Sequence, residues 1–230
     1  MNDLVQQSSY LIGSLEDIKK LEKKKQARIL VISDSHGDYD VFFDIIEEFG
    51  PDADAMVFCG DGVCDLVQYL EEAQDNETLR KAVPPVLAFV KGNGDSERYF
   101  YEEEISGGQV RRIIAAPHRI IFTAAGRHIM AVHGNRHGVD IGTETLLDTA
   151  SSLDADIVLF GHTHRPYWEE RAISLVLNPG SCSRPRGGIP ASFAVITFPG
   201  LTDRYCADFF EIGEGLFGKK TFRPFRLGQG

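Results

Sequence analysis

Aspartate, asparagine and histidine side chains recur directly after apolar runs of this sequence, each time beside a glycine. Five runs end this way: ISDSHGD with Asp34 and His36, FCGDG with Asp61, KGNGD with Asn93 and Asp95, AVHGN with His133, and GHTH with His162 and His164. One such ending would be a weak signal, because acidic residues and histidines are common in loops. Five endings in one chain are hard to explain by chance, and they indicate a shared site.

The seven side chains with ligand character form a mixed nitrogen and oxygen set. Four imidazoles and three carboxylate or amide groups suit Mn, Fe, Zn, Co or Ni, and suit calcium or thiolate-binding metals poorly. Seven protein ligands are too many for one catalytic ion that keeps an open position. They are the right number for two ions that share a bridging carboxylate and leave room for water.

The elements that must position these side chains alternate between strands and helices. The first half of the chain predicts strands over residues 28–35, 55–61 and 85–95, with helices over 39–49 and 65–74. This alternation favours parallel βαβ units, whose strands place their carboxyl ends at one edge of a sheet, where ligands bind. The second half predicts consecutive strands over 111–134 with a turn near Ala125–Gly126, a helix over 143–153, a strand over 156–162 and a β-rich remainder.

The order of these motifs resembles that of the calcineurin-like metallophosphoesterases. The series D-x-H, G-D, G-N-x-D, H-G and G-H-x-H extends over residues 29–181. The short spacings, the lack of a large inserted cap and the NPGS at 178–181 are most similar to the small single-domain phosphodiesterase branch, which also includes the retromer scaffold subunit. The resemblance implies a four-layer α/β/β/α sandwich of two mixed sheets, with a dinuclear metal site at the carboxyl ends of strands.

The resemblance also implies a role for each ligand. The first metal would be held by Asp34, His36 and His164, and the second by Asn93, His133 and His162, with Asp61 bridging the two. Two divalent transition metal ions are expected, manganese first, with Fe, Zn, Ni or Co as alternatives. The implied reaction is hydrolysis of a phosphodiester, or of a phosphomonoester, by metal-activated water.

Two positions depart from the family pattern. Gly94 stands where many members have a histidine that assists the leaving group, and Asn135 replaces the second histidine of an H-G-H motif. The leaving-group proton would then come from water or from His137. Asn93, Asp95 and His137 are the candidate catalytic residues, with Asp95 expected to orient a ligand. Asn93, Arg136 and His137 are the candidate substrate contacts, and a solvated loop explains the last two equally well.

Other interpretations of single residues stand beside the metal hypothesis. Asp34 and Asp61 could each cap the helix that follows, but capping does not predict the histidines. His118 and His128 lie in β-runs outside every motif and are interpreted as structural. An interaction scaffold that keeps the fold and has lost catalysis is the alternative function, although such a chain should have lost ligands and this one retains all seven.

Composition limits the partners and the compartment. The net charge of −10, from 34 acidic and 24 basic residues, disfavours stable binding of duplex nucleic acid, but a small phosphorylated substrate is compatible with bound metal ions. No apolar stretch is long enough to span a membrane, and four unpaired cysteines favour the cytoplasm. Residues 1–26 predict an N-terminal helical extension before a domain over 27–230. The extension either packs on that domain or pairs between subunits in a homo-oligomer.

Overall fold

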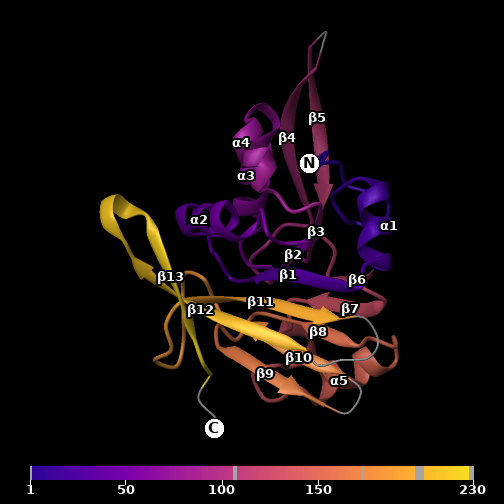
Figure 1. Ribbon diagram of the computed structural model, residues 1–230, viewed down its shortest axis with the longest axis vertical. Coiled ribbons are helices and arrows are strands. Elements are labelled where there is room, and N and C mark those ends of the chain that lie inside the picture. Colours follow the sequence, from indigo (N-terminus) through magenta and orange to yellow (C-terminus); the bar gives the residue numbers. More distant parts are fainter. Residues whose placement is uncertain (1, 106–107, 172–173, 200–204, 228–230) are drawn as a thin grey trace.

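Two stacked β-sheets form the centre of the computed structural model, which describes residues 2–105, 108–171, 174–199 and 205–227 (Figure 1). The six-stranded sheet has the order β13 (Lys220–Phe225), β12 (Cys206–Glu214), β11 (Ser192–Pro199), β1 (Gln26–Ile32), β2 (Ala55–Phe58), β3 (Val86–Phe89). The five-stranded sheet has the order β6 (Arg119–Ala124), β7 (Arg127–Val132), β8 (Ile157–Leu159), β10 (Leu175–Pro179), β9 (Pro166–Glu170).

Both sheets are mixed. In the first, β1, β2 and β3 are parallel, and β11 joins β1 in the antiparallel sense. In the second, β7, β8 and β10 are parallel, and β6 and β9 lie antiparallel on the two edges. The parallel strands β1, β2, β3, β7 and β8 carry the predicted ligands at their carboxyl ends, so each sheet presents part of the motif series to the same region.

Helices cover the outer face of each sheet. α2 (Tyr39–Phe49), α3 (Val63–Asp75) and α4 (Glu77–Ala82) pack on the six-stranded sheet, and α5 (Glu144–Ser151) packs on the five-stranded sheet. Alternation along β1 shows the layering: Leu30 and Ile32 join the cluster under the helices, whereas Ile29 and Val31 join the cluster between the sheets. The predicted α/β/β/α sandwich is therefore confirmed.

The N-terminal segment is only partly helical. The predicted helix over 1–26 is wrong in extent, since α1 covers Leu15–Lys23 and begins after Ser14, whose side chain accepts a hydrogen bond from the backbone of Asp17. The preceding residues cannot continue that helix, because Leu4 and Tyr10 have positive φ angles of 57° and 67°. Ile12 instead forms a bridge with Leu87, which fixes the segment on this chain's own sheet edge. Pairing of the helix between subunits stays a prediction.

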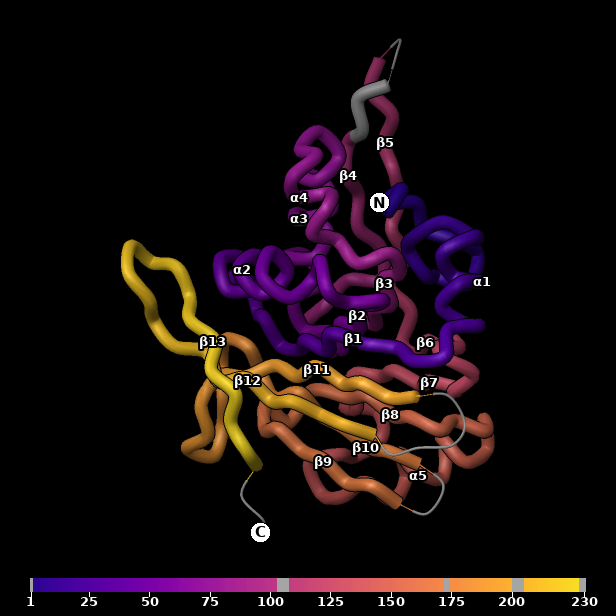
Figure 2. The backbone as a smooth tube through the Cα atoms, in the orientation of Figure 1, coloured from indigo at the N-terminus to yellow at the C-terminus, as the bar shows by residue number. Residues whose placement is uncertain are grey.

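A separate hairpin stands off the sandwich beside α3 and α4 (Figure 2). It consists of β4 (Arg98–Ile105) and β5 (Gly108–Ala115), which pair with each other in a two-stranded sheet. The sequence did not predict β4, and β5 begins earlier than the predicted strands, while the turn at Ala125–Gly126 is confirmed. Across the described residues, the helices all fall short of the length and apolar character that a membrane crossing requires.

Candidate metal centre

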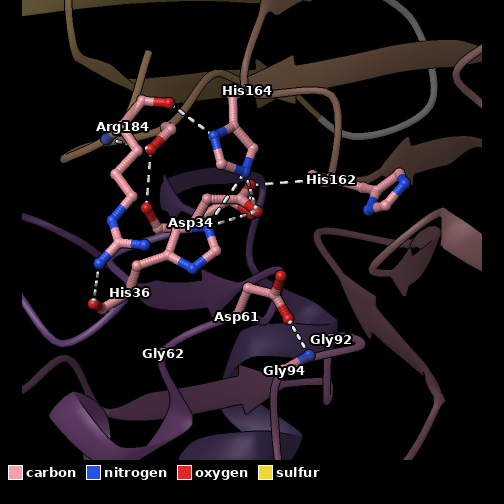
Figure 3. Close-up of polar contacts among 12 residues, drawn as sticks. Asp34, His36, Asp61, Gly62, Gly92, Gly94, His162, His164 and Arg184 are labelled. Atoms are coloured by element: carbon pink, nitrogen blue, oxygen red, sulfur yellow. Dashed lines mark hydrogen bonds and ion pairs between the residues drawn. The ribbon is translucent and has the colours of Figure 1, made fainter. Parts of the chain in front are cut away.

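The predicted ligands converge where the loops after β1, β2, β7 and β8 meet (Figure 3). Two groups bring their ligand atoms within 4.8 Å of one another: Asp34, His36 and His164 form the first, and Asp34, Asp61 and His133 form the second. Five of the seven predicted metal ligands are therefore brought together. The first group is the set that the sequence assigns to the first metal.

Asp34 lies at the centre of both groups. Its Oδ1 is 3.3 Å from His164 Nε2, 3.8 Å from His36 Nε2 and 4.0 Å from His133 Nε2. Its Oδ2 is already occupied, because it accepts hydrogen bonds from Ser33 Oγ at 2.6 Å and from the backbone N–H of His162 at 3.1 Å. One carboxylate oxygen therefore faces three imidazole nitrogens.

Two of these inward-facing atoms are buried and lack hydrogen bonds. Asp34 Oδ1 and His133 Nε2 find no hydrogen-bond partner among the residues that the structure describes. A buried polar atom without a partner is costly, and such atoms are uncommon in folded proteins. A carboxylate oxygen and an imidazole nitrogen that lie side by side without hydrogen bonds are ligand atoms that a divalent transition metal binds. The residues present thus fit the implied metal ions.

The hydrogen bonds of two histidines set which ring nitrogen is free. His133 Nδ1 lies 2.7 Å from the carbonyl oxygen of Cys59, and His164 Nδ1 lies 2.5 Å from that of Arg184. A carbonyl only accepts, so each Nδ1 must carry the proton and donate it. With the proton on Nδ1, each ring directs its Nε2 to the centre, as a metal-binding histidine requires.

The charges around His133 favour a cation at the centre. Burial opposes ionisation of Asp61, but His133 and the N–H of Gly94, which donates to Asp61 Oδ1 at 2.7 Å, outweigh it and lower the pKa of Asp61 to about 2. Burial likewise opposes protonation of His133, yet Asp61 and Asp34 raise its pKa. The field that favours a proton on His133 would equally favour a metal ion. At His36 burial dominates and lowers the pKa, which keeps that ring neutral near pH 7.

The backbone at the centre is left-handed at most of the predicted ligands. Asp34, His36, Asp61, His162 and His164 have positive φ angles between 50° and 69°. Few residues other than glycine adopt this region, and each instance costs about 1–3 kcal/mol unless its surroundings fix it. Close approach adds a second constraint, because a Cβ on Gly161 would clash with Ser33 Oγ. Strain gathered at one set of side chains indicates a functional site.

Asp95 organises the loop that carries Asp61. Its carboxylate accepts four backbone N–H groups, from Asp61 at 2.6 Å, Gly62 at 3.0 Å, Val63 at 2.9 Å and Gly92 at 2.8 Å. These contacts are those of a residue that orients a ligand, the role that the sequence predicts for Asp95. The two oxygens are occupied by the backbone, which argues against a role as a base.

His162 and Asn93 lie beside the two groups rather than in them. The ring of His162 is 5.1 Å from the ring of His133, but its Nε2 contacts Asp140 Oδ2 at 2.9 Å. Asn93 is exposed on the loop after β3, next to Gly94. The structure therefore places both predicted ligands at the rim of the centre.

Comparison with known proteins decides the family. A model of the calcineurin-like phosphoesterase superfamily domain matches residues 28–200. The chain belongs to this superfamily. It is 32% identical to the probable metallophosphoesterase YsnB of Bacillus subtilis over 74% of this chain and 83% of that protein. It is 29% identical to the phosphodiesterase YfcE of Escherichia coli over 74% of this chain and 86% of that protein.

The solved structures agree on the fold. The structure of Vacuolar Protein Sorting 29 from Cryptosporidium parvum matches with a TM-score of 0.61 at 21% identity, over 90% of this chain and 100% of that one. The relatives and the fold together confirm the small metallophosphoesterase branch that the motif series predicted. Metal binding and phosphoester hydrolysis are the general properties of this superfamily.

The phosphoesterase centre also uses residues that sequence analysis did not select. Asp65 Oδ2 accepts from Ser35 Oγ at 2.5 Å and from the N–H of Gly37 at 3.0 Å, which ties the first ligand loop to α3. Arg184 holds His164 through its carbonyl and donates its guanidinium to the carbonyl of His36 at 3.3 Å (Figure 3). The sequence contains only weak indications of these two residues. Asp65 is an aspartate four residues after Asp61, and Arg184 is an arginine just after the NPGS segment.

The capping alternative is wrong for both aspartates. Asp38 caps α2 through a hydrogen bond from Val41, and Gly62 occupies the N-cap position of α3. The NPGS segment supports the site, because Ser181 Oγ donates to the carbonyl of Asp34 at 2.7 Å. Neither Asp34 nor Asp61 is used as a helix cap, so both carboxylates can serve the metal centre.

Proposed function

We propose that this chain is a phosphodiesterase that requires two divalent transition metal ions, with manganese as the first candidate. The observation that carries the proposal is the buried pair of open donor atoms, Asp34 Oδ1 and His133 Nε2, with two further imidazoles facing the same carboxylate oxygen. When bound, two such ions activate water for attack on phosphorus and neutralise negative charge on the phosphate. The name of the relative YfcE supports a diester as the substrate.

The roles of the chain's residues follow the family assignment. Asp34, His36 and His164 would hold the first ion, Asn93, His133 and His162 would hold the second, and Asp61 would bridge them. Burial raises the pKa of Asp61, whereas His133 and His36 lower it, so histidines from both sides of the centre act on this carboxylate, which supports the bridge. His162 would have to exchange its contact with Asp140 for the ion.

Proton donation to the leaving group falls to His137 or to water, because Gly94 offers no side chain. His137 follows His133 by one short 3-10 helix, η1 (Asn135–His137), and its Nδ1 is buried without a hydrogen-bond partner in the described part of the chain. General acid help is typically worth about 10²–10⁴ in rate. We expect His137→Ala to slow hydrolysis of an alkyl ester by about 100-fold and of a nitrophenyl ester far less, measured as kcat for each. An equal effect on both would assign the proton to water.

The decisive experiment is an add-back assay. Protein stripped of metal with a chelator is supplied with Mn²⁺ and assayed on bis(p-nitrophenyl) phosphate and on p-nitrophenyl phosphate. We expect metal-dependent turnover of both with the diester preferred, and a preference for the monoester would correct the substrate class. Absence of turnover of either by folded, metal-loaded protein would overturn the proposal.

The similarity to Vacuolar Protein Sorting 29 supports one alternative, an interaction scaffold on the same fold. Gly94 favours it, because a catalytic histidine of the family pattern is missing there. The retained ligands favour catalysis instead. We also propose a small phosphorylated substrate rather than duplex nucleic acid, from the net charge of −10, and the cytoplasm as the compartment, from four free cysteines.

A further inference from the structure

A hollow of about 440 Å³ adjoins the metal centre on the side of His133. Besides His133, its wall carries two arginines and two histidines from separate segments: His118 and Arg119 where β6 begins, and Arg136 and His137 in η1. We call this cavity the basic hollow, after these four basic side chains. We propose that the basic hollow binds a second phosphate group, so that the substrate is a phosphodiester that carries a further phosphate on one of its alcohols.

The four side chains act on one another across the hollow. The pKa of His137 is lowered first by burial and then by Arg119, and the pKa of His118 is lowered first by burial and then by Arg136. Each arginine therefore influences the imidazole that comes from the other segment, and both segments line the same hollow. The imidazoles serve as hydrogen-bonding groups, while the two guanidiniums supply the positive charge.

The positive charge of the hollow is not cancelled by nearby carboxylates. Within the described ranges, neither Arg119 nor Arg136 forms an ion pair, although the chain as a whole has a net charge of −10. Glu97 lies 4.0 Å from His118 Nε2 and 3.8 Å from Lys91 Nζ, and it is not part of the wall. Asp61 and Asp34 contact His133, at the side of the hollow that meets the metal centre. Two unpaired guanidiniums in a concave site of an acidic protein fit a dianion.

The chemistry of the wall selects phosphate. Guanidinium groups bind phosphate oxygens in a bidentate manner, and imidazole N–H groups donate hydrogen bonds to the remaining oxygens. The hollow also includes His133, a predicted ligand of the second metal, so a group bound there is adjacent to the phosphoester under attack. This inference rests on the proposed function for the scissile group, but binding of phosphate to the hollow does not require catalysis.

The kinetic test uses two substrates that differ by one phosphate: the p-nitrophenyl ester of thymidine 5′-phosphate, and the same ester with a 3′-phosphate. We expect the second to have a kcat/KM at least about tenfold higher, as one charge-assisted contact predicts. Arg119→Gln should reduce this ratio to about one, whereas the matched control Arg223→Gln, an exposed arginine on β13, should keep it. A ratio near one in the wild-type protein would overturn the inference while leaving the phosphodiesterase intact. A matching pair of esters built on glycerol shows whether a nucleoside is needed.

A binding test separates the two proposals. Calorimetry with inorganic phosphate on chelator-treated protein measures the hollow without catalysis. We expect saturable binding that weakens about tenfold or more in Arg119→Gln and stays unchanged in Arg223→Gln. Equal binding by the wild-type and Arg119→Gln proteins would overturn the inference even if no substrate is hydrolysed.

Discussion

The inner and outer halves of the metal centre differ in how firmly the fold holds them. In the inner half, Asp34, His133 and His164 are 0%, 1% and 4% exposed, and hydrogen bonds from backbone or neighbouring side chains fix each one. In the outer half, Asn93 is exposed and His162 contacts Asp140, whose side chain is 58% exposed. The predicted inner ligands are preorganised by the core, whereas the predicted outer ligands would have to be recruited on binding of an ion.

This difference predicts unequal affinities for the two ions. A preformed set of ligands loses little conformational freedom on binding, and a set that must exchange contacts binds more weakly. The ion held by Asp34, His36 and His164 should therefore bind first. Three substitutions test how the two halves are linked.

Asp61→Asn should have the largest effect, because Asp61 is the predicted bridge between the halves. We expect the metal content, measured by mass spectrometry of the bound ions, to fall from two per chain to none, and turnover to fall more than about 100-fold. Asp52→Asn, an exposed substitution on the loop before β2, is the control. Retention of one ion would assign the shared position to Asp34, which is common to both groups.

Asp95→Ala should weaken the inner half without removing a ligand. Four backbone N–H groups would lose their charged acceptor, so we expect about 10–100-fold weaker metal binding and a free energy of unfolding lower by about 3 kcal/mol or more. Titration calorimetry and urea denaturation measure the two effects. Asp95→Asn keeps one acceptor oxygen and should lose less, and an unchanged metal affinity in both variants would show that the loop does not need Asp95.

Asp140→Ala should have the smallest effect and the opposite sign. Its exposed contact with His162 is worth at most about 1 kcal/mol, so its loss should release His162 and tighten binding of the second ion by up to about fivefold. Stepwise metal titration measures this, with the exposed Asp148→Ala on α5 as the control. Weaker binding of the second ion would instead show that Asp140 supports His162 as a ligand.

The inner half was also the part most accessible to sequence analysis. Asp34, His36, Asp61, His133 and His164 follow buried strands whose periodicity and flanking glycines are unambiguous, and the fold brings these side chains together. The positions of the outer side chains are set by individual contacts such as that of His162 with Asp140. The periodicity of the sequence does not predict such contacts.

Elements outside the sandwich were predicted less well for a related reason. Among the described residues β4 pairs with β5 alone, and its glutamate-rich sequence lacks the apolar alternation of a core strand. The N-terminal residues have leucines at helical spacing but take left-handed turns at Leu4 and Tyr10 to reach the edge of β3. His118, which was interpreted as structural, lines the basic hollow because the start of β6 comes beside η1 in three dimensions.

The left-handed backbone at five predicted ligands has a consequence for how such a fold changes over evolution. Glycine adopts this conformation without the steric cost that histidine and aspartate carry, so replacing a ligand with glycine can relieve strain as it destroys the site. A lineage released from selection for hydrolysis would therefore gain stability from the first substitutions that inactivate it. This chain carries histidine or aspartate at all five positions, as expected of a chain that uses these side chains as ligands.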